Sequence, residues 1–224
     1  MDTTTKTILA MKQSLLFRDF SEECCSSVLE ELAAEQKWVG KGEVILHKDD
    51  PVARFGLVVE GVVHGITLSI DGNESVSQFC RPNRFFAIEF AAASTNRCPL
   101  AYVCKEDALI VLFEFKRLLQ SNFDSGLRET ILVNMVNLLA LRNKKNYERM
   151  EILEQNSLRQ RILLYLGNMS RRKGADCFID CKNREEMAAY LSVNRSALSN
   201  ELRKMKDDKL IDFHKNEFRL LKSP

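Results

Sequence analysis

The stretch NREEMAAYLSVNRSALSNELRKM, residues 183–205, constrains the fold more than any other part of the chain. Asn183 and Glu186 have the spacing of a helix-starting capping box, and Asn194 is a good second N-cap. Between them Ser192 occupies a turn position that commonly needs positive φ. The helix after Asn194 carries three apolar residues at helical spacing, Leu198, Leu202 and Met205. The stretch therefore predicts a helix-turn-helix.

The opposite face of the second helix is polar and basic and contains no acidic residue. We expect it to read base edges in the major groove through Arg195, Ser196, Ser199 and Asn200. Arg195 suits guanine and Asn200 suits adenine, while the two serines are short and permissive. We expect phosphate contacts from Asn183, Arg184, Arg203, Lys204 and Lys206. An ordinary helical hairpin is the alternative, but strand-like runs at residues 210–214 and 218–221 predict an adjoining wing.

Charge and cysteine content limit the remaining classes of protein. The net charge is +2 over 224 residues, yet residues 154–224 hold 15 basic and 10 acidic residues, which makes this third basic. A basic module on an acidic body favours a DNA-binding module attached to a sensing domain. The seven cysteines lack zinc spacing, and no signal peptide or apolar stretch of membrane-spanning length is present. We expect free thiols, no metal site, no membrane association and a cytoplasmic location.

The pattern along the chain predicts an α+β fold. Residues 3–36 look helical, and many short strands between residues 38 and 113, with a hairpin signal at Asp71-Gly72, favour an antiparallel barrel or jelly roll. We expect three parts: an effector-sensing barrel domain at 1–123, a long dimerisation helix at 124–154 and a winged helix-turn-helix domain at 155–224. The long helix would span about 42 Å. Its expected dimer seam consists of Leu127, Ile131, Met135, Leu138 and Leu141. The alternative is a helix that packs only within its own chain.

This order of elements resembles the Crp/Fnr family of bacterial transcription regulators over nearly the whole chain. The matching stretches are GEVI at 42–45, VVEGV at 58–62, FAIEF at 86–90, RIL at 161–163, REEMA at 184–188 with Arg195, and DDKLI at 207–211. The resemblance implies a homodimer that binds a palindromic operator in double-stranded DNA, with half-sites one helical turn apart, and that contacts RNA polymerase. It also implies a cyclic-nucleotide-binding-type barrel.

The barrel departs from the family pattern for cyclic nucleotide. Members that bind it generally have a glycine–glutamate pair and, ten residues later, an arginine–serine pair that holds the phosphate. Here Glu89 follows Ile88, and the later positions are Pro99 and Leu100. Neither can hold a phosphate, because a buried anion must be paired and hydrogen-bonded; Arg97 could replace the arginine only if the loop shifts.

We therefore expect an unidentified small-molecule effector, with no cofactor assigned. Its expected pocket consists of Phe86, Glu89, Phe90, Arg97, Cys98, Asn146 and Tyr147. The alternatives are a regulator that needs no effector and a redox-responsive one, with cyclic nucleotide less favoured. An enzyme is disfavoured, since the three histidines cannot form a cupin-type metal site and no nucleophile set or phosphate-binding loop is present. We expect no catalytic residue.

Overall fold

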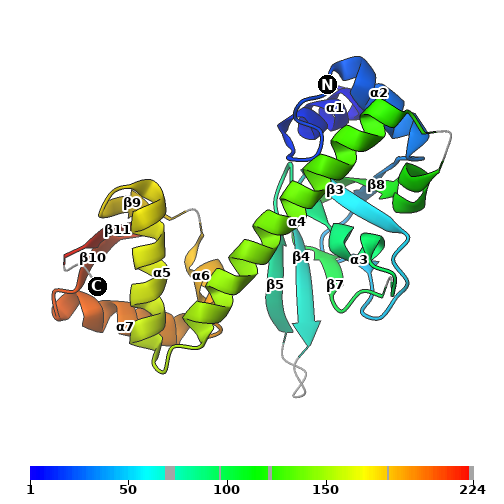
Figure 1. The fold of residues 1–224 in the computed structure, drawn as a ribbon. Helices are drawn as coiled ribbons and strands as arrows, with labels where there is room; N and C mark the ends of the chain where they lie inside the picture. The colour runs from blue at the N-terminus through cyan, green and yellow to red at the C-terminus, as the bar shows by residue number, and fades with distance from the viewer. Residues whose placement is uncertain (69–73, 96, 121–122, 181, 222–224) are drawn as a thin grey trace. The chain divides into compact units, whose positions relative to one another are not determined.

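The computed structural model describes residues 1–68, 74–95, 97–120, 123–180 and 182–221 (Figure 1). The chain divides into two compact units, Met1–Leu141 and Arg142–Pro224. This division falls inside the long helix, so the predicted three-part boundaries at 123 and 154 stay a prediction. The expected hairpin turn at Asp71-Gly72 lies outside the described residues.

Two four-stranded antiparallel sheets form the described barrel of the first unit. One has the order β1 (Glu35–Val39), β8 (Ala108–Glu114), β3 (Arg54–Glu60) and β6 (Phe85–Phe86). The other has the order β2 (Val44–Leu46), β7 (Ala101–Cys104), β4 (Val63–Leu68) and β5 (Glu74–Cys80). The apolar runs of β3 and β8 are buried almost throughout, and Phe55 of β3 stacks on Phe113 of β8 with ring centroids 5.2 Å apart. The expected double-sheet fold is confirmed.

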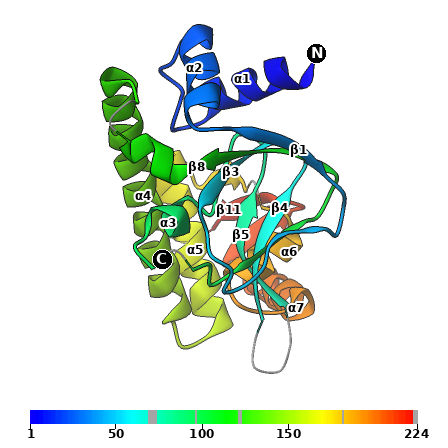
Figure 2. The ribbon, with the colours of Figure 1, turned by 90° about the vertical axis from the view of Figure 1, so that its right-hand side faces the viewer.

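Helices close one end of this barrel (Figure 2). They are α1 (Thr3–Gln13) and α2 (Glu22–Glu31), and Ser21 caps α2 as its sequence suggests, accepting from the Cys24 amide. The helical reading of residues 3–36 is wrong at residues 14–21, which connect the two helices, and at its end, where Glu35 begins β1 and pairs with Leu112. Two short helices follow along the chain, α3 (Ile88–Ala92) and the 3-10 helix η1 (Phe115–Leu119).

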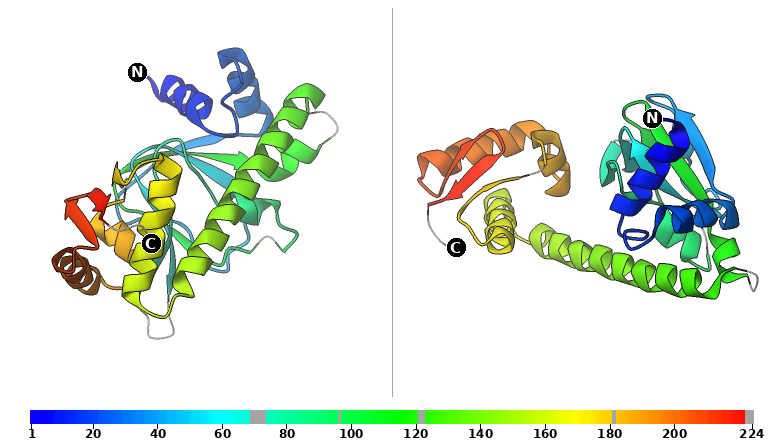
Figure 3. Two further views of the ribbon diagram at one scale, coloured as in Figure 1. Left: turned by 60° about the vertical axis from the view of Figure 1, so that its left-hand side comes forward. Right: turned by 90° about the horizontal axis from the view of Figure 1, so that it is seen from above.

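The long helix α4 (Ser125–Leu153) is continuous (Figure 3). Asp124 accepts a hydrogen bond from the Leu127 amide and so caps its first turn. In the barrel unit, the buried side chain of Asn134 donates to the carbonyl of Leu16, 3.0 Å away. This bond fixes the rotation of the N-terminal half of α4 about its own axis.

The second unit is a winged helix. It contains α5 (Leu158–Lys173), β9 (Cys177–Ile179), α6 (Arg184–Tyr190), α7 (Arg195–Asp207), β10 (Ile211–His214) and β11 (Glu217–Leu220). The strands form an antiparallel sheet in the order β10-β11-β9. Gly174, with φ of 64°, ends α5. Side chains from every helix of this unit meet the sheet in one apolar core.

Candidate nucleic-acid interface

The first helix of the motif starts as the sequence predicts. The Asn183 side chain accepts from the Glu186 amide at 2.9 Å, and the Glu186 carboxylate accepts from the Asn183 amide at 3.0 Å. This is a complete capping box. Because the backbone N–H and the side-chain oxygen of Asn183 are used in the cap, only its side-chain nitrogen is left for the predicted phosphate contact.

The turn between α6 and α7 has the hydrogen bonds of a Schellman motif. The Val193 amide donates to the Ala188 carbonyl at 3.0 Å, and the Ser192 amide donates to the Ala189 carbonyl at 3.2 Å. Ser192 has φ of 54°, the left-handed value expected for this position. Its side chain is exposed, so the strain is confined to the backbone.

Helix α7 separates an apolar face from a polar one. Asn194 caps it by accepting from the Ala197 amide at 2.7 Å. Three residues are buried as predicted: Leu198, Leu202 and Met205. On the opposite face Arg195, Ser196 and Asn200 are exposed, and Ser199 is half-buried. Arg195 lies 3.7 Å from Glu185 of α6 across the turn, an exposed ion pair that DNA can displace at little cost.

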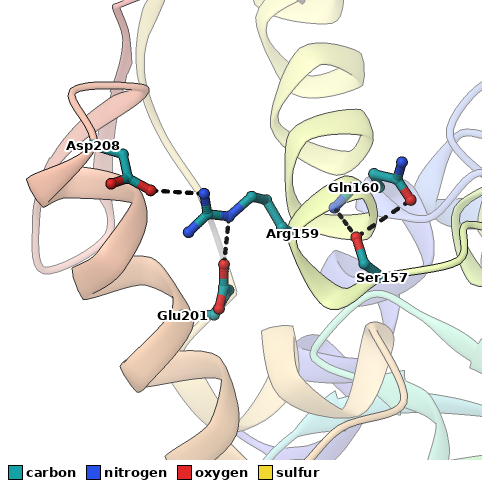
Figure 4. A network of polar contacts seen from close by, with 5 residues as sticks. All are labelled: Ser157, Arg159, Gln160, Glu201 and Asp208. Carbon is teal, nitrogen blue, oxygen red and sulfur yellow. Dashed lines mark hydrogen bonds and ion pairs between the residues drawn. The ribbon is translucent and has the colours of Figure 1, made fainter.

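An arginine of α5 holds α7 in place (Figure 4). Arg159 Nε donates to Glu201 Oε1 at 2.6 Å, and a terminal nitrogen donates to Asp208 Oδ2 at 2.6 Å. The hydrogen bond that Arg159 donates to Glu201 is the main cause that raises the pKa of Arg159. Ser157 caps the same turn of α5 by accepting from the Gln160 amide. The role of Arg159 could not be predicted from the sequence, because its partners lie 42 and 49 residues away and leave no local signal.

Two of the predicted phosphate contacts are engaged within the wing. The Arg184 guanidinium lies 5.1 and 4.9 Å from the ring centroids of Phe213 and Phe218, and it donates to the Lys215 carbonyl at 2.8 Å. Its desolvation lowers the pKa of Arg184. Lys206 pairs with Asp212 at 2.6 Å. A phosphate would have to displace these partners, so we assign Arg184 and Lys206 first to bracing the wing.

Arg203 and Lys204 remain the cations of α7 best placed for phosphate. Both side chains are exposed. Among the residues that the structure describes, neither makes a salt bridge within 4.0 Å. Their use in DNA binding stays a prediction.

The expected dimer seam of α4 is wrong in register. Ile131, Met135 and Leu138 are buried in the core of their own barrel unit, and Leu127 packs against that core. These side chains cannot also face a second helix. Of the five predicted residues only Leu141 is exposed. The exposed apolar stripe of α4 has a different heptad register and comprises Val133, Val136, Ala140, Tyr147 and Met150.

Near α3, aromatic and aliphatic side chains occupy the barrel interior. The ring of Phe86 covers Gly56 so closely that a Cβ there would lie 2.0 Å from Phe86 Cζ. Leu100 and Tyr102 cover Gly65 in the same way, at 3.1 and 3.0 Å from a Cβ. Leu100, at one position of the family's phosphate-holding pair, is therefore part of an apolar wall. Pro99, at the other, is exposed and has no N–H.

Glu89 belongs to a hydrogen-bonded chain in this wall. Gln78 Nε2 donates to Glu89 Oε1 at 2.6 Å, the Tyr102 hydroxyl donates to Gln78 Oε1 at 2.9 Å, and the Ala87 amide donates to the Tyr102 hydroxyl at 3.1 Å. Burial, with the charge of Glu89, raises the pKa of Tyr102. The side-chain amide of Gln78 thus satisfies a carboxylate where a ligand contact was expected.

The other predicted pocket residues differ in exposure and in their partners. Phe90 is half-buried against the barrel core. Arg97 is exposed and donates to the Asp49 carbonyl at 2.8 Å, while burial raises the pKa of its neighbour Cys98. Asn146 and Tyr147 are exposed and belong to the second unit. The loop shift that would make Arg97 a phosphate ligand would break its bond to Asp49.

Two absences concern only the described ranges. Within them, no group of three or more His, Cys, Asp and Glu side chains could hold a metal ion. No helix there is long and apolar enough to cross a membrane.

A barrel, a long helix and a winged helix-turn-helix together define the class to which this fold belongs. No family model and no curated protein matches the sequence. Similar solved structures include a CooA mutant from Carboxydothermus hydrogenoformans, with 17% identity, coverage of 91% of this chain and 88% of that one, and a TM-score of 0.67. The c-di-GMP-responsive global regulator CLP of Xanthomonas campestris has 16% identity, coverage of 90% and 100%, and a TM-score of 0.63.

A CRP-family transcriptional regulator of Thermus thermophilus has 19% identity, coverage of 83% and 92%, and a TM-score of 0.53. The fold is therefore that of the Crp/Fnr transcription regulators, as the sequence resemblance implied.

Proposed function

We propose that this chain is a sequence-specific DNA-binding transcription regulator, not an enzyme, and that it acts as a homodimer on a palindromic operator. One observation carries the proposal: the exposed face of α7 holds Arg195, Ser196, Asn200 and Arg203, while the buried face fixes the helix in the core. Arg195 reads guanine in bidentate fashion and Asn200 reads adenine. Ser196 and Ser199 contact phosphate or a single base. RNA polymerase is the further partner that the resemblance implies.

The test compares Arg195→Ala with Arg203→Gln on duplexes selected by the wild-type protein from a random-sequence library. Arg195→Ala should lower specific affinity by about 1–3 kcal/mol for each half-site and relax the preference at one base pair of each half-site. Arg203→Gln, which removes one proposed phosphate contact in each protomer, should weaken binding to all sequences alike and reduce the salt slope of the dimer by about 2. An unchanged base preference for Arg195→Ala would refute the proposed docking.

The homodimer is supported by the exposed apolar stripe of α4. Pairing of two such stripes about a twofold axis would bury them and present two copies of α7 to half-sites one helical turn apart. In a gated regulator, an effector would shift the population between two such pairings. The proposed effector is not a typical cyclic nucleotide, because the side chains of Pro99 and Leu100 offer its phosphate no cation and no hydrogen-bond donor.

Regulation without any effector is the second candidate. It is favoured by Phe86, Leu100 and Tyr102, which occupy barrel space beside α3. Titrating DNA affinity with and without the small-molecule fraction of a cell extract separates the two. A shift in affinity, together with a bound species in native mass spectrometry, would support gating. An unchanged affinity and a protein free of bound molecules would favour the effector-independent candidate.

A further inference from the structure

A side chain from the C-terminal part of α4 contacts the end of α6. Arg149 Nε donates to the Tyr190 carbonyl at 3.0 Å, and a terminal nitrogen donates to the Ala189 carbonyl at 3.0 Å. The guanidinium carbon lies 5.4 Å from the centroid of the Tyr190 ring. The group is half-buried, and its desolvation lowers the pKa of Arg149. The partly desolvated guanidinium of Arg149 is therefore held in one geometry by these contacts.

These contacts complete the end of α6. The last carbonyls of a helix have no partner within it. The Schellman turn supplies amides to Ala188 and Ala189, while the Tyr190 carbonyl receives its bond from Arg149. A cation there also interacts favourably with the negative end of the helix dipole. The first helix of the DNA-binding motif is thus capped by a side chain of α4.

A second arginine extends the connection to the next residue. Arg161 Nε donates to the Gln155 carbonyl at 3.2 Å, and a terminal nitrogen reaches the Leu191 carbonyl at 3.5 Å. Gln155 lies in the connection between α4 and α5. The arginines of α4 and α5 therefore bind three consecutive carbonyls at the start of the turn, those of residues 189, 190 and 191.

The ring of Tyr190 also contacts two other side chains. Lys182 Nζ lies 4.9 Å from its centroid, and the Tyr165 ring lies 5.4 Å away. Burial raises the pKa of Tyr190. Both the backbone and the side chain of the last α6 residue are consequently fixed relative to the C-terminal turns of α4.

We propose that Arg149 is a positioning residue that couples the C-terminal turns of α4 to the helix-turn-helix, so that rotation of these turns moves α6 and α7 with them. The inference rests on the proposed function, because its effect is measured as the accuracy of DNA reading.

Three full-length variants test the coupling. Arg149→Gln removes the charge and at least one of the two carbonyl bonds, while Arg149→Lys keeps the charge but cannot make the paired bonds of a guanidinium. Arg172→Gln is the matched control. Arg172 also joins α5 to α4, through Glu148 at 2.9 Å. Its charge acts on the Tyr190 hydroxyl, but within the described part of the chain it makes no hydrogen bond or ion pair with α6 or α7.

The readout is the ratio of affinities for a duplex selected by the wild-type protein and for a scrambled duplex. Arg149→Gln should lower this ratio about tenfold, within the range typical of coupling between sites. Arg149→Lys should give a smaller loss, and Arg172→Gln none. The salt slope should not change, since a positioning residue neutralises no phosphate. Amide exchange at residues 189–193 should quicken in Arg149→Gln and stay unchanged in Arg172→Gln.

The outcomes separate this inference from the proposed function. A wild-type protein that does not distinguish the duplexes refutes the proposed function. A wild-type protein that distinguishes them, with an unchanged ratio in both Arg149 variants, overturns the inference alone. Equal loss of both affinities with a reduced salt slope would make Arg149 a phosphate contact and also overturn it. If Arg149→Gln fails to fold, the smaller expected loss in Arg149→Lys remains decisive.

Discussion

Replacing Val136 by alanine should weaken the proposed dimer about thirtyfold while leaving the barrel unit folded. Val136 lies on the exposed stripe of α4, and its side chain is 66% exposed. Each methyl group removed from a buried site costs about 0.8 kcal/mol. The substitution removes two methyl groups from each of the two copies. A partner can cover about two-thirds of their surface, so the free energy of dimerisation falls by about 2 kcal/mol.

The adjacent residue provides the control. Met135 is 4% exposed and packs in the barrel core, so Met135→Ala should cost about 2–5 kcal/mol of unfolding free energy. Sedimentation equilibrium measures the dimer dissociation constant, and urea denaturation measures the stability of the barrel unit. If Met135→Ala weakened dimerisation without changing the stability of the barrel unit, while Val136→Ala left dimerisation unchanged, this assignment of the two faces would be refuted. The register predicted from the sequence would then be restored.

Three further predictions concern backbone strain and thiol chemistry. Ser192→Gly should raise the free energy of unfolding by up to about 1 kcal/mol, because relief of the left-handed strain exceeds the added conformational freedom of the unfolded chain. A decrease of more than about 1 kcal/mol in the free energy of unfolding, measured by urea denaturation, would contradict this. Burial raises the pKa of Cys25 from 9.0 to about 11, so maleimide at pH 8 should modify exposed Cys177 and spare Cys25, as peptide mass spectrometry would report. The raised pKa favours the protonated Cys25 thiol in the folded state, so its contribution to the free energy of unfolding is full below pH 9. This contribution should be lost at about 1.4 kcal/mol per pH unit as the pH rises towards 11. Denaturation midpoints that do not change with pH over this window would contradict the prediction.

Local chemistry explains why the helix-turn-helix could be predicted residue by residue. Asn183, Glu186 and Asn194 form their caps with amides three residues away, and such spacings are visible in the sequence. The polar face of α7 follows from helical periodicity alone. Neither inference depends on what the rest of the chain does.

The face of α4 could not be predicted, because this helix carries two apolar stripes. Periodicity detects both Ile131–Met135–Leu138 and Val133–Val136–Ala140, and only packing against the barrel decides which one is buried. The barrel interior depends likewise on tertiary pairs such as Gln78 with Glu89. Arg149 and Arg159 contact helices some 40 residues away, so their roles have no local signal.

The engagement of Arg184 and Lys206 in the wing changes how the proposed interface gains specificity. Neutralised phosphates supply an affinity that is largely independent of sequence and steeply dependent on salt. With these two cations tied to the wing and Glu185 beside Arg195, few unengaged cations remain on α7, chiefly Arg203 and Lys204. Binding must then rely more on the contacts of Arg195 and Asn200 with bases. Such contacts tolerate little misplacement of α7, and the clamps of Arg159 on α7 and Arg149 on α6 limit that misplacement.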